Sequence, residues 1–119
     1  MESGIMIRWG EPKTGRELEA IELFHRTVGH FGRLVTEGKL AYFEPFMLTS
    51  GDTGVESGFF IFRGQVADVF ATLDSAEYRD IIMRAGLLLQ HLRIDMLAVG
   101  ERIERNMAEY QQALMAVRS

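Results

Sequence analysis

Three charged residues, Arg8, Glu44 and Arg63, stand inside or directly beside strongly apolar runs of this 119-residue chain. A guanidinium group keeps its charge at physiological pH and binds carboxylates or phosphates through paired hydrogen bonds. Two guanidinium groups beside one carboxylate leave one positive charge over. If the three side chains meet, the chemistry that they offer is recognition of a small organic molecule that carries an anionic group.

Alternation along β-strands decides whether these side chains can meet, because successive residues of a strand point to opposite faces of a sheet. Arg8 alternates with apolar residues that should face a layer of helices, so it should point the other way. Tyr42 and Glu44 share one face of a second strand, and Arg63 lies on the corresponding face of a third. An apolar cavity with a few polar groups is the usual form of a small-molecule site. We therefore predict ligand-binding residues Arg8, Tyr42, Glu44 and Arg63. The alternative is that both arginines reach solvent at strand ends while Glu44 pairs locally.

Four strands and four helices are expected from the spacing of apolar and turn-forming residues. The strands are expected at residues 4–9, 40–48, 58–63 and 94–99, and the helices between Thr14 and Gly38 and at 65–73, 77–92 and 101–117. Pro45 has no backbone N–H, so the second strand should lie at a sheet edge or carry a bulge. Ser75 is expected to cap the third helix.

The long first helix carries the clearest pattern. Its apolar residues recur at spacings of three and four over about five turns; they are Ile21, Phe24, Val28, Phe31 and Val35. Thr14 and Glu17 stand at the spacing of a capping box, and Gly38 is expected to end the helix. Gly29 and Gly32 each lower helix stability by about 1 kcal/mol relative to alanine. We expect them to let another backbone approach closely.

The order of these elements predicts a ferredoxin-like α+β fold. A strand-helix-strand crossover, a hairpin and a second crossover give an antiparallel sheet of order 4-1-3-2 with the helices on one face. The last helix is additional to this plan. The length suits one domain, residues 1–119.

The third strand is apolar on both faces, which favours a homodimer. Phe59 and Ile61 point one way, and Phe60 and Phe62 point the other. A sheet face that meets water reads polar, so a second apolar face needs a cover. A second copy of the chain would supply it by face-to-face pairing, as in a dimeric α/β barrel. The alternative cover is the C-terminal helix of the same chain.

The composition excludes several classes of function. The chain has no cysteine, which excludes disulfides and thiolate chemistry. His25 and His91 have no partners at metal-ligand spacing, so no metal site is predicted. Thirteen Lys and Arg stand against 17 Asp and Glu without a basic run, which disfavours nucleic acid. We expect no membrane contact and a cytoplasmic location, since neither a signal peptide nor an apolar run of about 20 residues is evident.

Residues 30–75 resemble the YCII-related branch of the dimeric α/β-barrel superfamily. The resemblance rests on His30-Phe31-Gly32-Arg33-Leu34, Gly38-Lys39-Leu40, Glu44-Pro45, Gly58-Phe59-Phe60 and Asp74-Ser75. Glu44 stands where that family tends to have glycine, and the terminal helix departs from its pattern. The resemblance implies a ferredoxin-like homodimer. The superfamily includes cofactor-free oxygenases, isomerases, haem enzymes and ligand sensors, so the resemblance does not fix one activity.

The resemblance also assigns roles to two side chains. YCII-like proteins are proposed to use a histidine of the first helix and an aspartate near the second as an acid/base pair. His30 and Asp74 occupy these positions here. The alternatives are an exposed His30, which lies off the apolar stripe, and an Asp74 that belongs to a helix start.

Two functions follow. In the first, a cofactor-independent enzyme uses an acid/base group in an inter-sheet cavity on a small organic molecule. In the second, the homodimer binds a ligand or a partner without catalysis. An open cavity that contains a histidine or carboxylate with a strongly perturbed pKa would favour the enzyme.

Overall fold

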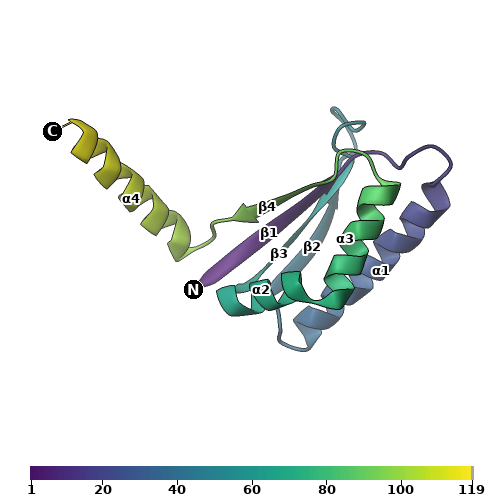
Figure 1. Ribbon diagram of the computed structural model, residues 1–119, viewed down its shortest axis with the longest axis horizontal. Coiled ribbons are helices and arrows are strands. Elements are labelled where there is room, and N and C mark those ends of the chain that lie inside the picture. The colour runs from purple at the N-terminus through teal and green to yellow at the C-terminus, as the bar shows by residue number, and fades with distance from the viewer. Residues whose placement is uncertain (119) are drawn as a thin grey trace.

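The computed structural model describes residues 1–118, which form every predicted element in the predicted order (Figure 1). In chain order the elements are β1 (Glu2–Trp9), α1 (Glu17–Thr36), β2 (Tyr42–Met47), β3 (Gly58–Gln65), α2 (Val66–Asp74), α3 (Ala76–Leu88), β4 (Arg93–Leu97) and α4 (Glu101–Arg118). Among the described residues, no helix combines the length and apolar character needed to cross a membrane.

The strands form one antiparallel sheet in the order β2-β3-β1-β4, which confirms the predicted strand order. β1 and β3 lie side by side in the centre, where Ile5 pairs with Phe62 and Ile7 pairs with Phe60. β2 is an edge strand and contains Pro45. An edge position suits a residue that cannot donate a backbone hydrogen bond.

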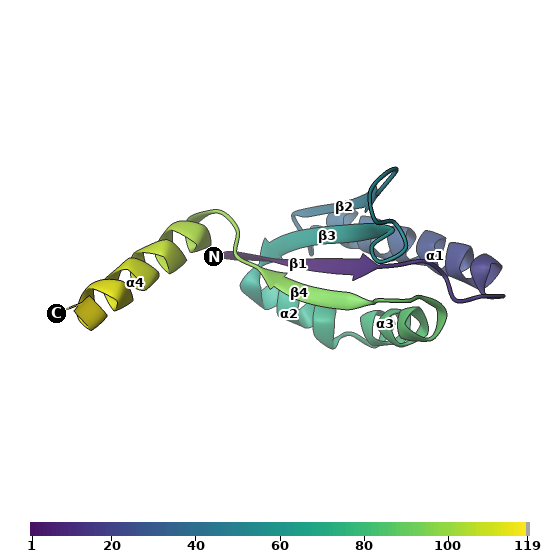
Figure 2. The same ribbon diagram turned by 90° about the horizontal axis from the view of Figure 1, so that it is seen from above.

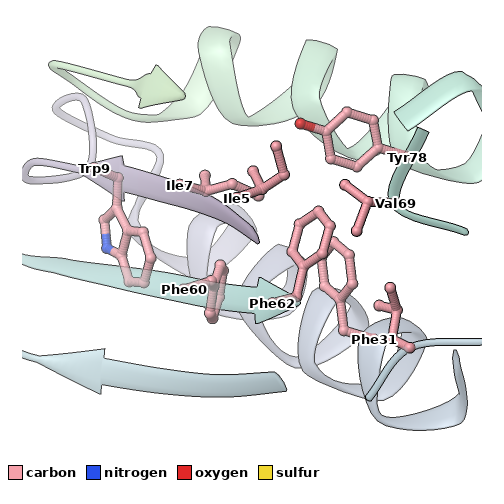
Figure 3. Close-up of a cluster of buried hydrophobic side chains, with 9 residues drawn as sticks. Ile5, Ile7, Trp9, Phe31, Phe60, Phe62, Val69 and Tyr78 are labelled. Atoms are coloured by element: carbon pink, nitrogen blue, oxygen red, sulfur yellow. The ribbon is translucent and has the colours of Figure 1, made fainter. Parts of the chain in front are cut away.

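Helices α1, α2 and α3 cover one face of the sheet, and the core lies between them and the strands (Figures 1 and 2). The ring of Phe31 from α1 stacks on Phe62 with centroids 4.7 Å apart, and it stacks on Phe43 at 5.1 Å. Figure 3 shows Val69 of α2 and Tyr78 of α3 beside these rings. Full burial of such a side chain stabilises the fold by about 1.5–3 kcal/mol, so this cluster fixes the helices to the sheet.

The start of α1 differs from the prediction. Arg16 occupies the N-cap position, but its side chain makes no hydrogen bond to the helix backbone. The Glu17 carboxylate accepts a hydrogen bond from the N–H of Gly15 at 3.3 Å. The predicted capping box of Thr14 and Glu17 is therefore wrong. Gly15 adopts a φ of +83°, so the chain turns there and the helix can begin only after the turn. At the other end, the φ of +76° at Gly38 confirms that residue as the stop.

The buried face of α1 is broader than the apolar stripe. Leu23, Thr27 and His30 are buried, whereas Ile21 is 53% exposed. The reason is that α1 packs on α3 as well as on the sheet. The alternative of an exposed His30 is therefore wrong, because this residue lies on the side of α1 that is covered.

Gly29 and Gly32 do not serve the expected purpose within this chain. A Cβ atom added at either position would meet no atom of the described residues within 4 Å. No second backbone of the described residues approaches α1 there, so the predicted close approach does not occur within this part of the chain.

α3 ends at Leu88, earlier than the predicted helix, which extended to residue 92. The backbone turns extended at Leu89. Gln90 then pairs with the segment after β1, since Gly10 donates to its carbonyl at 2.7 Å and its own N–H binds the Glu11 carbonyl at 3.0 Å. These bonds replace helical ones and direct the chain into β4.

α4 projects from the rest of the fold and contacts β1 near its start (Figures 1 and 2). None of its described residues is buried, and it extends beyond one end of the sheet. It does not cover the second face of the sheet. The alternative prediction, in which the C-terminal helix of the same chain covers this face, is therefore wrong. That second face, which we call the open face, lacks a helical layer in the described chain.

Candidate ligand-binding site

A cavity of about 360 Å³ lies between the helices and the sheet, near the C-terminal end of β1. Three aromatic side chains line it, those of Trp9, Phe24 and Phe60. The ring centroids of Trp9 and Phe60 are 4.5 Å apart, and those of Phe24 and Phe60 are 5.5 Å apart. We call this space the helix-side cavity. Its volume falls at the small end of the range for small-molecule sites, which starts at about 300 Å³.

Small residues on the two helices leave this space open. Ala20 and Thr27 of α1 and Ala85 of α3 line the cavity. The cores of folded proteins are otherwise filled to crystal-like density, so a void of this size needs short side chains around it. Leucine at any of these positions would fill part of the space.

Gly58 seats the indole ring of Trp9. A Cβ atom at this position would lie 2.7 Å from Cζ2 of Trp9 and 2.6 Å from the carbonyl oxygen of Phe46. Both distances are shorter than any normal contact. The missing side chain at Gly58 therefore allows the indole ring of Trp9 to lie against β3, and Figure 3 shows this ring beside Phe60.

Few polar groups reach the helix-side cavity. The hydroxyl of Thr27 donates to the Leu23 carbonyl at 2.7 Å, and that of Ser57 donates to the Thr53 carbonyl at 2.5 Å. These hydroxyls keep lone pairs that can accept a bond. His25 is the only ionisable residue among the lining residues, and it is exposed. The arrangement suits a molecule with an apolar body and a single polar group that reaches the imidazole.

His30, the predicted catalytic histidine, is a buried residue of α1. Its Nε2 atom has no hydrogen-bond partner among the described residues. Burial lowers the pKa of His30, and the nearby Glu77 carboxylate opposes this shift. The histidine with the perturbed pKa does not line the helix-side cavity, so cavity and perturbed group are separate in the described chain.

Asp74, the predicted partner of His30, is exposed at the end of α2. The carboxylate whose charge acts on His30 is that of Glu77. Glu77 is itself bound to Arg26, whose Nε lies 3.1 Å from its Oε1. The acid/base pair of His30 and Asp74 thus stays a prediction. Ser75 accepts the N–H of Tyr78 at 3.2 Å, which confirms the predicted cap of α3.

The four predicted ligand-binding residues do share the open face, as their registers show. Tyr42 lies opposite Arg63, and Glu44 lies two residues further along β2, opposite Ile61. Arg8 lies opposite Phe59, four residues from Arg63 along β3. Each side chain, however, already has a partner within the chain. The Tyr42 hydroxyl donates to the Glu44 carboxylate, and this bond is the main cause that raises the pKa of Tyr42.

The two arginines of the open face are balanced by carboxylates. Arg8 forms ion pairs with Asp95 and with Glu56, whose Oε1 lies 3.6 Å from its Nε. Arg63 pairs with Glu2 at 3.3 Å. The expected surplus of positive charge is therefore absent from these pairs, and the predicted alternative of local pairing describes Glu44. Stacked rings of Phe46 and Phe59, 4.8 Å apart, lie beside these charges.

Comparison with solved structures shows a ferredoxin-like fold. Rv0793 from Mycobacterium tuberculosis has a TM-score of 0.65 and 16% identity over 84% of this chain and 96% of its own. A variant of SnoaB, a cofactor-independent oxygenase from Streptomyces nogalater, has a TM-score of 0.61 and 14% identity over 82% of this chain and 92% of its own. A dimeric protein of unknown function and ferredoxin-like fold from Bacteroides fragilis has a TM-score of 0.59 and 7% identity over 81% and 94%.

No protein-family model matches the sequence, and no curated protein matches it either. At these identities the solved structures show the fold alone, and the specific link to YCII-related proteins stays a prediction. The matched chains are covered almost whole, whereas part of this chain lies outside each match. The chain thus has residues beyond the shared fold.

The sequence prediction missed the helix-side cavity. One feature of the sequence could have indicated this cavity, a tryptophan that pairs with a glycine across two strands. Trp9 and Gly58 are opposite each other in the central ladder. Ala20 of α1 and Ala85 of α3 are small residues that also leave the cavity open. The sequence alone does not show that they lie opposite this pair, because that depends on how α1 and α3 pack on the sheet.

Proposed function

We propose that this protein is a homodimer that binds a small organic molecule with an aromatic or otherwise apolar body in the helix-side cavity. The cavity itself carries this proposal: about 360 Å³ of space, walled by Trp9, Phe24 and Phe60, with few polar groups. Apolar cavities with a few polar groups are the usual form of a ligand site. The polar group of the ligand would bind His25 at the exposed side.

Catalysis is a second version of the same proposal, and two observations favour it. His25 is the one ionisable lining residue, and a neutral imidazole can remove a proton from an acidic O–H group. A protein of the same fold, SnoaB, is a cofactor-independent oxygenase. This second point is an analogy of fold. A ligand recovered unchanged after incubation with the protein and oxygen would favour binding without catalysis.

Homodimer formation through the open face is supported by its apolar residues. Phe59 and Ile61 point away from the helices and are only half-buried in the single chain. α4 leaves this face uncovered, and a dimeric protein shares the fold. We expect light scattering to give about twice the 13.5 kDa chain mass. A monomer at micromolar concentration would contradict this part of the proposal.

Trp9 is the only tryptophan of the chain, so its emission reports on the cavity directly. We expect 6-bromo-2-naphthol to quench this emission saturably, because a bromine atom quenches indole on contact. Calorimetry on the same samples gives the affinity independently of the fluorescence. Replacing His25 with Gln should weaken the naphthol several-fold and leave 2-bromonaphthalene, which lacks the hydroxyl, unchanged.

A matched pair of variants tests where the molecule binds. Ala85→Leu fills the cavity and should weaken binding at least tenfold, whereas Ala113→Leu on exposed α4 should leave it unchanged. Circular dichroism checks that both variants fold. Equal affinity for both would place the ligand elsewhere and overturn the proposal.

A further inference from the structure

α4 is a long helix that contacts the rest of the fold near its start, where Nη1 of Arg105 is 3.6 Å from Sδ of Met1. Its 18 residues span about 27 Å and include no buried side chain. Isolated helices of this length are marginal in water, and most helical stability in proteins comes from packing of an apolar face. A helix that protrudes from the fold therefore needs a partner surface to remain helical.

The apolar residues of α4 form a narrow seam. They are 47–85% exposed and recur at spacings of 4, 3, 4 and 3; they are Ile103, Met107, Tyr110, Leu114 and Val117. This repeat averages 3.5 residues, which is the period of a coiled-coil seam and narrower than the apolar face of a helix that packs on a sheet. The surface that it fits is another helix.

Charges beside the seam distinguish the possible directions of such a pair. Glu104 and Arg118 flank opposite ends of the seam on the same side. In a parallel pair of identical helices, the residues that flank the seam between them are Asn106 with Gln111 and Ala113 with Arg118, which are not ion pairs.

An antiparallel pair uses the charges. With a two-fold axis at the level of Gln112, Tyr110 faces Leu114 of the second copy and Met107 faces its Val117. Glu104 then lies beside Arg118 of the second copy, and the symmetry makes this ion pair twice. Such an interface, with one patch that complements itself, is the usual form of a two-fold contact.

We infer that α4 pairs with α4 of a second copy of this chain, antiparallel, through the seam from Met107 to Val117. This contact is separate from the helix-side cavity and from the open face of the sheet. It therefore goes beyond the proposed function, and neither the ligand nor the sheet contact is needed for it.

The absence of cysteine from the sequence makes disulfide trapping specific. Full-length Tyr110→Cys chains with an affinity tag are mixed with untagged Leu114→Cys chains and oxidised mildly. An antiparallel pair brings these two positions within the Cα separation of about 4–7 Å that a disulfide needs. We expect the mixed, once-tagged dimer to be the main product. Gln112→Cys on the outer face is the control and should stay monomeric on a non-reducing gel.

Each other outcome overturns the inference in a recognisable way. If Tyr110→Cys chains form disulfides with one another and none with Leu114→Cys chains, the helices pair in parallel. Equal linkage of the Gln112→Cys control would show random collision, and no linkage at any position would show that the seam packs elsewhere. Binding of 6-bromo-2-naphthol is measured on the same chains, so that failure of the helix pair and failure of the cavity proposal are seen separately.

Discussion

The two faces of the sheet are built from adjacent residues of the same strands, yet they differ in chemistry. Toward the helices, Phe60 and Trp9 meet no charge and leave an apolar cavity. Toward the open face, their neighbours Phe59 and Arg8 lie among ion pairs, and Arg8 alone contacts two carboxylates. One face holds empty apolar space, and the other holds charges that are already balanced.

This difference shows where a ligand finds free interactions. A charged group whose partners lie on the same chain gains little by exchanging them for a ligand, because the ion pair must be broken first. An unfilled apolar cavity has no such cost. The sequence pattern predicted a site at the charged residues of the strands, whereas the cavity that we propose as the site lies on the other face of the sheet.

The largest test of the comparison replaces one phenylalanine on each face. Phe62 is fully buried, so Phe62→Ala should lower the free energy of unfolding by about 3–5 kcal/mol. Phe59→Ala should lower the free energy of unfolding by less than half of that at low protein concentration. The loss should grow as the concentration rises, because Phe59 lies in the proposed dimer contact. Urea unfolding at two concentrations measures both. Equal costs without concentration dependence would show that the faces are equivalent.

A smaller effect is expected from two glycines. Gly58→Ala forces a Cβ into Trp9 and the Phe46 carbonyl, so we expect a loss of about 1–3 kcal/mol and a shift of Trp9 emission. Gly29→Ala adds a Cβ in open space on a helix and should raise stability by about 1 kcal/mol. A destabilising Gly29→Ala would mean that a second copy packs on α1 at this point.

The smallest effect concerns two tyrosines. Burial raises the pKa of Tyr78 to about 12, whereas the Glu44 carboxylate is the main cause that raises the pKa of Tyr42. Glu44→Gln should therefore lower the pKa of Tyr42 and leave Tyr78 unchanged in an ultraviolet titration. A shift of both, or of neither, would contradict the assignment of causes.

Tyr78 also links stability to alkaline pH. Its folded-state pKa lies above the ordinary value of 10.0, so the folded chain holds the proton more tightly than the unfolded one. The stabilisation is complete below pH 10 and is lost as the pH rises toward 12. In Tyr78→Phe this part of the pH dependence should disappear.

Strand faces were predictable because alternation is a local rule. The sequence around Ile61 was sufficient to show that β3 is apolar on both sides. Pro45 narrowed β2 to an edge position or a bulge, and the structure shows the edge position. The cap of α1 was not predictable from spacing, since the backbone of Gly15 turns before the helix can start. The alternative of an exposed His30 was wrong because the packing of α1 on α3, which buries this residue, lies outside any single-helix pattern.

The candidate site was less predictable than the fold. Arg8, Tyr42, Glu44 and Arg63 were placed on the correct face, but their partners Asp95, Glu56 and Glu2 come from distant segments. The cavity exists because small residues at several positions leave the same space unfilled. Pattern rules describe which residues are present and say little about space that none of them fills.

Pro45 affects whether copies of this chain can polymerise by adding strands to the edge of the sheet. A sheet can be extended by any strand that finds free N–H and C=O groups along its edge, and this is how fibrils are templated. At the β2 edge the proline interrupts that row of groups. Only β4 offers an uninterrupted edge, and it carries Arg93 and Asp95, charges of the kind that discourage such growth. The sheet is thus protected against open-ended polymerisation at both sides, by a missing donor at one and by charge at the other.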